Sequence, residues 1–69
     1  MEKKVTNRIR EYRKRSGLTQ EDLAGEMKVS RQTIISIEKG KYVPSLPLAL
    51  RIARYFDCPA DEMFIIEKE

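Results

Sequence analysis

The polar side chains with the most specific chemistry stand between Thr19 and Glu38. Two short helical patterns are joined there by a tight turn, and Ser30 opens the second pattern. Arg31, Gln32 and Thr33 follow Ser30 directly, so they lie at the free tip of the second helix. Their donors and acceptors are of the kind that read base edges. A helix tip presented in this way fits the major groove of DNA.

Catalytic and metal-binding chemistry has little support in the composition. The chain contains no His and a single Cys, which removes His-based catalysis and the usual zinc ligand sets. Asp61 and Glu62 are adjacent and point to different helix faces, and the glycines are too scattered for a phosphate-binding loop. We therefore expect no enzyme, no metal and no cofactor. Cys58 is interpreted as a buried structural thiol, with a redox switch as the alternative.

Length and charge indicate one small domain that meets a polyanion. The 69 residues predict a single domain over 1–69, which is marginally stable alone and gains from dimerisation. The net charge is only +3, but residues 1–15 hold seven Lys or Arg against two Glu, whereas residues 57–69 hold five acids against one Lys. A basic end and an acidic end suit a protein that presents one face to nucleic acid, and a solvated charged surface is the alternative.

The composition also predicts the cellular compartment. No run of 18 apolar residues occurs, and the charged N-terminus has no apolar segment typical of a signal peptide. The lone cysteine cannot form an internal disulfide, as is usual in the cytosol. We expect a cytoplasmic protein without a membrane partner.

Five helices are predicted to position the polar tip. The first is capped by Thr6 or Asn7 and ends near Arg15, with Ile9 and Tyr12 inward and Arg13 among the outward cations. Thr19 caps the second, where Asp22 only partly replaces the Glu of a capping box. The third covers 31–39, the fourth follows Ser45, and the fifth covers 59–64.

The core expectations follow from helical spacing. The second and third helices bury Leu23, Ala24, Met27, Val29, Ile34 and Ile37, and the fourth buries Leu46, Ala49, Leu50, Ala53 and Phe56. The segments 3–6 and 64–66 are short and β-prone, so they pair as a small antiparallel sheet or remain frayed tails.

The spacing of these residues resembles one family throughout residues 7–64. The chain is similar to the lambda-repressor-like (Cro/repressor type) helix-turn-helix domains, especially compact stand-alone regulators such as the cytolysin-operon repressor. The matching segments are Leu18-Thr19-Gln20-x-x-Leu23-Ala24, Val29-Ser30-Arg31-Gln32-Thr33-Ile34, Ile37-Glu38-x-Gly40-x-x-x-Pro44-Ser45-Leu46 and Leu50-x-Ile52-Ala53. The resemblance implies an all-α five-helix homodimer, and it favours the small sheet from the chain ends.

The resemblance also implies roles for individual residues at DNA. Arg31, Gln32 and Ser36 match base-reading positions, where Arg suits guanine and Gln suits adenine. Thr33 is a further candidate for a thymine methyl or a phosphate. The candidates for phosphate contacts are Gln20, Lys28, Lys39, Lys41 and Tyr42, with Arg10, Arg13 and Lys14 as weaker ones. About 4–6 phosphate contacts per monomer are expected, with solvated surface as the alternative for each residue.

Three positions raise separate questions. Lys28 stands where the family usually has a turn glycine, so a left-handed backbone there costs about 1 kcal/mol relative to glycine. Pro59 replaces a Ser or Thr cap. Glu38 is either an exposed acid or paired with a cation such as Arg8 or Lys41.

A dimer completes the predicted function. The helix 59–64 and the flank of the fourth helix are expected to form a two-fold interface through Pro59, Ala60, Met63, Phe64 and Ile66. The resulting prediction is a dimeric regulator, most often a repressor on a palindromic operator, with no small-molecule ligand. The alternative is a protein-interaction module such as an antitoxin or bridging factor.

Overall fold

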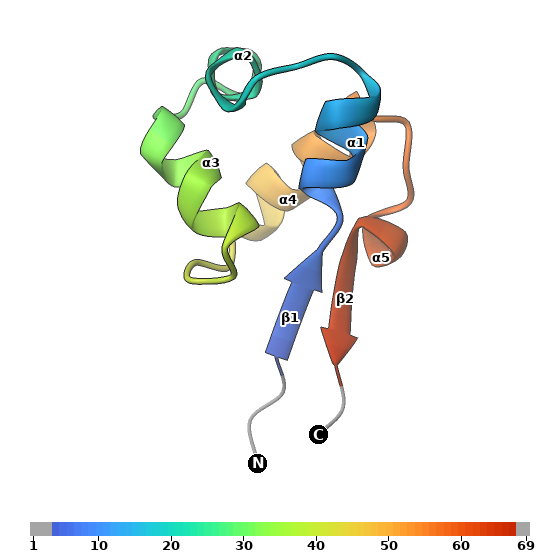
Figure 1. The fold of residues 1–69 in the computed structure, drawn as a ribbon. Helices are drawn as coiled ribbons and strands as arrows, with labels where there is room; N and C mark the ends of the chain where they lie inside the picture. The colour runs from blue at the N-terminus through green and yellow to red at the C-terminus, as the bar shows by residue number, and fades with distance from the viewer. Residues whose placement is uncertain (1–3, 68–69) are drawn as a thin grey trace.

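The computed structural model describes residues 4–67 and shows a helical domain with a small sheet (Figure 1). The elements in chain order are β1 (Lys4–Asn7), α1 (Ile9–Arg15), α2 (Gln20–Met27), α3 (Arg31–Glu38), α4 (Leu46–Tyr55), α5 (Ala60–Met63) and β2 (Phe64–Glu67). The all-α five-helix expectation with a terminal sheet is therefore confirmed. No helix among residues 4–67 has the length and apolarity needed to cross a membrane.

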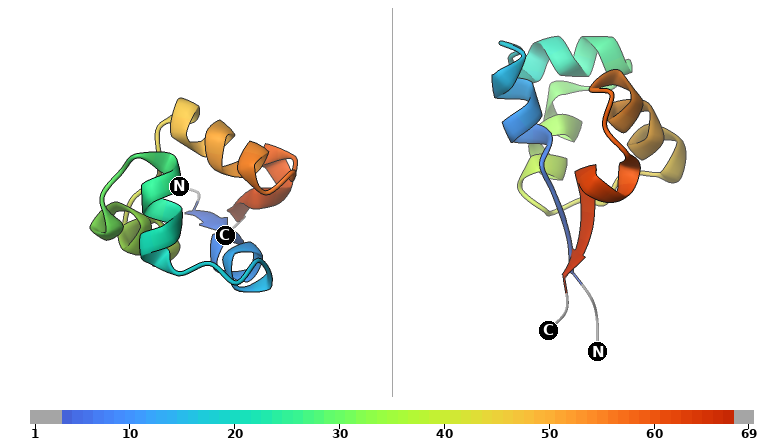
Figure 2. Two further views of the ribbon diagram at one scale, coloured as in Figure 1. Left: turned by 90° about the horizontal axis from the view of Figure 1, so that it is seen from above. Right: turned by 90° about the vertical axis from the view of Figure 1, so that its right-hand side faces the viewer.

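The two chain ends pair as an antiparallel sheet, as the β-prone ends and the resemblance favoured. Val5 lies opposite Ile66, Thr6 opposite Ile65, and Asn7 opposite Phe64. The Thr6 hydroxyl donates to Glu67 Oε2 across the pair at 3.0 Å. The sheet extends from the helical body (Figure 2). The predicted strand start at Lys3 lies outside the described residues.

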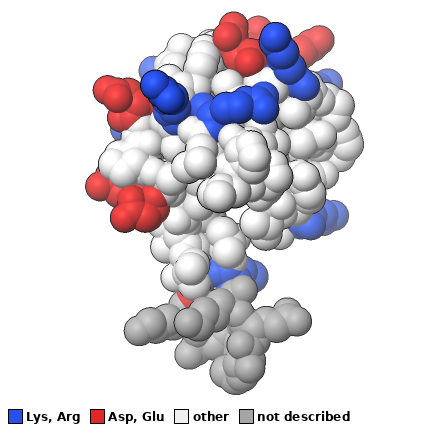
Figure 3. All heavy atoms as spheres, turned by 180° about the vertical axis from the view of Figure 1, so that it is seen from behind, with Lys and Arg blue, Asp and Glu red and all other residues white. Residues whose placement is uncertain are grey.

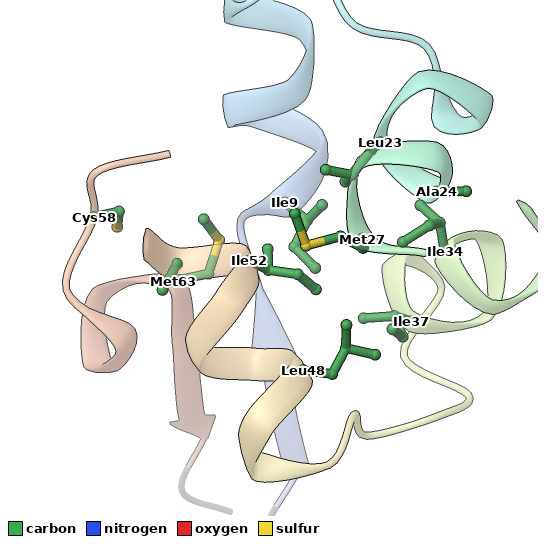
Figure 4. Packing of buried hydrophobic residues seen from close by; sticks show 11 residues of the cluster. Ile9, Leu23, Ala24, Met27, Ile34, Ile37, Leu48, Ile52, Cys58 and Met63 are labelled. Atoms are coloured by element: carbon green, nitrogen blue, oxygen red, sulfur yellow. The ribbon is translucent and has the colours of Figure 1, made fainter. Parts of the chain in front are cut away.

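The core lies where the helices and the sheet base meet (Figure 4). It contains Ile9, Leu23, Ala24, Met27, Ile34, Ile37, Leu48, Ile52, Ala53, Cys58 and Met63. Cys58 is buried and its thiol donates to Tyr12 Oη at 3.3 Å. The contact with Cys58, together with desolvation, raises the pKa of Tyr12. The interpretation of Cys58 as a structural thiol agrees with this burial.

The face that α4 buries differs from the predicted one. Leu46 is 70% exposed and Leu50 is 47% exposed, while Leu48 and Ile52 are buried with Ala53. Apolar residues cover all of this helix except the side that carries the exposed Arg51 and Arg54, so spacing alone does not fix the centre of the buried stripe. The pair Leu48 and Ile52, one turn apart, faces the core, and this places Leu46 and Leu50 on an outer flank.

The fifth helix is shorter than expected and starts without a side-chain cap. Pro59 occupies the N-cap position, and its carbonyl accepts from the backbone N–H of Glu62 and of Met63, both at 3.0 Å. Phe64 already belongs to β2. Met63 has 0% exposure because the single turn of α5 points it into the chain's own core.

The turn between α2 and α3 has the predicted left-handed residue. Lys28 has φ 59° and ψ 43°, and its backbone N–H donates to the Gly25 carbonyl while that of Val29 donates to Ala24. This bonding closes the last turn of α2 and reverses the chain toward Ser30.

Replacing Lys28 with Gly is therefore expected to be neutral or stabilising by about 0.4–1 kcal/mol in urea unfolding, because glycine adopts this backbone without a Cβ penalty. Lys28→Ala is the matched control, since it removes the same charge but keeps the Cβ, and it should give no such gain. A clear loss of stability in Lys28→Gly would contradict the left-handed turn.

The N-terminus of α2 carries a complete capping box, so the expectation that Asp22 only partly serves was wrong. Thr19 Oγ1 accepts from the Asp22 backbone N–H at 3.0 Å, and Asp22 Oδ2 accepts from the Thr19 backbone N–H at 2.9 Å. The shorter Asp22 side chain thus makes the reciprocal bond that Glu makes in other capping boxes, with Thr19 in the extended backbone of an N-cap, φ −82° and ψ 168°. Hydrogen bonds from the backbone and side chain of Thr19 lower the pKa of Asp22.

This lowered pKa predicts an acid-dependent loss of stability. A depressed folded-state pKa stabilises the fold above the unfolded value of about 3.9, and the effect disappears as the pH falls through the lowered pKa. In urea melts between pH 6 and pH 2, Asp22→Asn should lose the part of the acid dependence that Asp22 contributes. The neighbouring Glu21→Gln is the control and should retain it; equal curves for Asp22→Asn and the unchanged protein would refute the assignment.

Candidate nucleic-acid interface

The tip of α3 is formed by a local cap. Ser30 has an extended backbone, and its Oγ accepts from the Thr33 backbone N–H at 3.1 Å. The same Oγ lies 2.9 Å from Thr33 Oγ1. This geometry ends the turn after Lys28 and starts α3 with Arg31 and Gln32 exposed. The Thr33 hydroxyl is held by the cap, so it is less available to a ligand than the side chains of Arg31 and Gln32.

The base-reading candidates separate into two groups around α3. Gln32, Thr33 and Ser36 line a shallow hollow together with Ser30 and Tyr42. Arg31 instead lines a larger groove that also contains Gln20 and Lys39. The structure therefore places Tyr42, a predicted phosphate contact, beside the uncharged candidates for base contacts. It places Arg31, a candidate for base contacts, beside the predicted phosphate contacts Gln20 and Lys39. Lys28 and Lys41 are exposed at either end of α3.

The larger groove, about 700 Å³ in volume, joins three helices. We name it the basic groove, and its charged and amide side chains are Arg10, Arg13 and Lys14 from α1, Gln20 and Glu21 from α2, Arg31 and Glu38 from α3, and Lys39 at the end of α3. The cations outnumber the carboxylates, so the groove attracts an anion.

A buried ion pair lies beside this groove and corrects two expectations. Glu38 Oε2 accepts from Arg13 Nε at 2.8 Å, and Oε1 accepts from Arg13 Nη2 at 3.2 Å. The exposed fractions of the two side chains are 11% for Arg13 and 6% for Glu38. The interpretation of Glu38 as the partner of a cation is confirmed, but the cation is Arg13 rather than Arg8 or Lys41, and Arg13 does not point outward. Arg13 follows Ile9 by four residues, so the two share the inner face of α1, a signal available in the sequence.

The same pair holds Gln20. Its Nε2 donates to Glu38 Oε1 at 3.2 Å, while Arg13 Nη1 donates to the Leu18 carbonyl at 2.9 Å. Gln20 is thus oriented by α3 as well as by its own helix. Gln20 also lines the basic groove.

Asn7 was considered only as a helix cap, and its second role was missed. Its Oδ1 accepts from the Ile9 backbone N–H at 3.2 Å, and its Nδ2 donates to the Ile37 carbonyl at 2.9 Å. One side chain therefore connects β1 and the start of α1 to the last turn of α3. Arg51 of α4 similarly donates to the Met27 carbonyl. Both contacts join residues more than twenty positions apart, and no local pattern signals them.

The comparison with known sequences decides the family. The sequence model described as "Helix-turn-helix" matches residues 9–63, which span α1 to α5. The chain belongs to the Cro/C1-type helix-turn-helix family. The chain is therefore a DNA-binding transcriptional regulator.

Relatives occur in archaea and bacteria. The chain is 54% identical over 65 residues to an HTH-type transcriptional regulator of Methanocaldococcus jannaschii, covering 94% of this chain and 98% of that protein. It is 46% identical to the HTH-type transcriptional regulator YgzD of Bacillus subtilis, with coverage of 94% and 98%. Among solved structures, the restriction-modification controller protein C.AhdI of Aeromonas hydrophila matches with a TM-score of 0.71 and 34% identity, covering 80% of this chain and 83% of that chain.

The predicted dimer residues of this helix-turn-helix protein are only partly available at the surface. Pro59 is exposed, Ala60 and Phe64 are half-buried, and Ile66 is 64% exposed. Met63 is removed from the candidate interface because it is fully buried within one chain. The outer flank of α4 adds Leu46 and Leu50. Seen from the side opposite to Figure 1, uncharged side chains cover the centre of the molecule below a band of Lys and Arg (Figure 3).

Proposed function

We propose that this regulator is a repressor that binds a palindromic operator as a homodimer, with α3 and Lys39 as the recognition segment. The observation that carries the proposal is the exposed start of α3, where Ser30 caps the helix and leaves Arg31 and Gln32 unobstructed. Ser36 extends the same surface by one helical turn. Occupying the operator then excludes polymerase.

Base reading and backbone contact are assigned to different side chains. Arg31, Gln32 and Ser36 reach base edges, where Arg donates in pairs to guanine and Gln bonds adenine. Thr33 contributes its methyl group, because its hydroxyl is occupied by Ser30. The phosphate contacts are assigned to Gln20, Lys28, Lys39, Lys41 and Tyr42. Since these contacts release counterions, binding weakens as salt rises.

A second copy of the chain is needed for tight and specific binding. One module of this size buries about 600–1,000 Å² on DNA, and two modules related by a two-fold axis reach half-sites about 34 Å apart. We place the interface on Leu46 and Leu50 with Pro59, Ala60, Phe64 and Ile66. Leu46, Leu50 and Ile66 are 70%, 47% and 64% exposed, and burial against a second copy would remove this apolar surface from water. The recognition helices remain free in this arrangement.

The proposal also includes a location. The chromosome is the binding partner of a transcriptional regulator, and the relatives above are archaeal and bacterial. We therefore place this protein in the prokaryotic cytoplasm, at the nucleoid when it is bound.

Selection from a randomised duplex pool, with sequencing across a range of salt, tests the function. The expected result is enrichment of a two-fold-symmetric site whose affinity falls steeply with salt. Salt-sensitive binding without an enriched motif would instead indicate an architectural DNA-binding protein. Absence of binding would favour the protein-interaction module, and repression itself is tested with a reporter gene under the selected site.

The dimer interface predicts a separate result. The variant Leu46→Ser/Leu50→Ser should shift the protein from dimer to monomer in analytical ultracentrifugation, because it removes two exposed apolar side chains from the proposed contact. Tyr55→Ser is the control, since Tyr55 is also exposed on α4 but packs against Phe56, with ring centroids 5.1 Å apart. A double variant that remains dimeric would exclude this face.

A further inference from the structure

We infer that Arg10 and Lys14 of α1 bind backbone phosphates of the DNA segment that flanks the half-site read by α3. This inference rests on the proposed function and extends its contact surface to a helix outside the helix-turn-helix motif. It assigns the basic groove as the path of one DNA strand. The ligand is the phosphodiester backbone of a duplex.

The first support is continuity with the recognition helix. Arg10 and Lys14 line the basic groove together with Gln20, Arg31 and Lys39. The two α1 cations are four residues apart, so they lie on the same face of the helix. A DNA strand that contacts Arg31 and Gln20 therefore passes the α1 cations on the same side of the molecule.

The second support is the charge balance of the groove. It contains five cations and two carboxylates, Glu21 and Glu38, which leaves a net charge of +3. The buried carboxylate of Glu38 is already paired with Arg13, at 2.8 Å. Within residues 4–67 this is the only ion pair, so neither Arg10 nor Lys14 is neutralised by a described carboxylate. Two exposed like charges one turn apart repel each other slightly, and a phosphate between them relieves that repulsion.

The third support is the contrast with the next residue of the same helix. Arg15 lies over the Tyr12 ring, 5.1 Å from its centroid, and lines a different hollow with Tyr55 and Phe56. Arg15 therefore carries the same charge on the same helix but faces away from the basic groove. It provides a matched control that separates a specific phosphate contact from a general effect of net charge.

The test measures how binding depends on salt. The full-length protein and the variants Arg10→Gln, Lys14→Gln, the double variant and Arg15→Gln are titrated against a fluorescent 30-base-pair duplex between 50 and 200 mM KCl. A fixed duplex of arbitrary sequence and the selected operator are both used as probes. Urea midpoints of all variants verify that these exposed substitutions leave the fold intact.

Each lost phosphate contact makes the negative slope of log K against log salt shallower by about 0.9. Each groove substitution should therefore make it shallower by about 1.8 in a dimer. The affinity change between the two salt limits then shrinks about tenfold per substitution. The preference between sequences should stay the same, because backbone contacts carry no base information. Arg15→Gln should leave the slope near that of the unchanged protein.

The outcomes separate this inference from the proposed function. An unchanged slope in the double variant, or an equal drop in Arg15→Gln, overturns the inference even if the operator is bound specifically. Salt-dependent binding without sequence preference overturns the specific regulator, while a slope change confined to the groove variants still supports the α1 contact. Failure of the unchanged protein to bind either duplex overturns both.

Discussion

Glu38→Gln is expected to destabilise the protein by about 3–5 kcal/mol, because it leaves the guanidinium of Arg13 buried without a countercharge. The Arg13 side chain is only 11% exposed and has its carboxylate partner at 2.8 Å. A domain of this size has a free energy of unfolding of about 3–10 kcal/mol. The variant should therefore be close to unfolded at room temperature, as measured by urea titration followed by circular dichroism.

A double-mutant cycle distinguishes the ion pair from the loss of packing. Arg13→Met should also be strongly destabilising, because the Glu38 carboxylate then remains buried without its cation. The double variant Arg13→Met/Glu38→Leu should be more stable than either single variant, since no unpaired charge remains. Additive losses in the double variant would show that the two side chains contribute independently.

The second large effect is expected at the start of α3. Arg31→Ala or Gln32→Ala should weaken binding to the selected operator by about 2–6 kcal/mol, because one base contact contributes about 1–3 kcal/mol and is lost in both half-sites of a dimer. Competition titrations with the operator and a scrambled duplex measure this loss. Binding to the scrambled duplex should change little in Gln32→Ala, since glutamine carries no charge.

Two internal comparisons sharpen this prediction. Arg31 lines the basic groove, so Arg31→Ala should also reduce the salt dependence, whereas Gln32→Ala should not. Ser36→Ala should have a smaller effect because a single hydroxyl bonds several bases with little discrimination. If Arg31→Ala and Gln32→Ala weaken operator and scrambled DNA equally, the base-reading assignment is wrong.

The structure explains how a short helix keeps a defined orientation. Ser30 caps the start of α3, and the left-handed Lys28 sets the angle at which the chain enters it. At the other end of α3, in its last turn, Asn7 donates to the Ile37 carbonyl and Arg13 pairs with Glu38. Both ends of α3 are therefore anchored before DNA arrives, which lowers the entropy lost on binding.

The sequence by itself determined the elements whose signals are local. Ser30 and Ser45 cap the helices that follow them. Gly17 and Gly40 stand two residues after the ends of α1 and α3 and have positive φ, a backbone that glycine adopts readily. Lys28 has the left-handed backbone that the turn requires. These features depend on residues within one helical turn, so a pattern of residue types is enough to predict them.

The tertiary structure decided the features that depend on distant partners. Arg13 and Glu38 are 25 positions apart, and Asn7 and Ile37 are 30 positions apart, so no local pattern predicts either pair. The buried face of α4 is ambiguous from its sequence, because apolar residues cover more than half of that helix. Only its packing partners select Leu48 and Ile52 over Leu46 and Leu50. The sequence pattern predicts Met63 at the dimer interface, whereas the single turn of α5 points its side chain into the core. Local propensity sets where a helix begins and ends, whereas burial and charge pairing are settled by which helices meet.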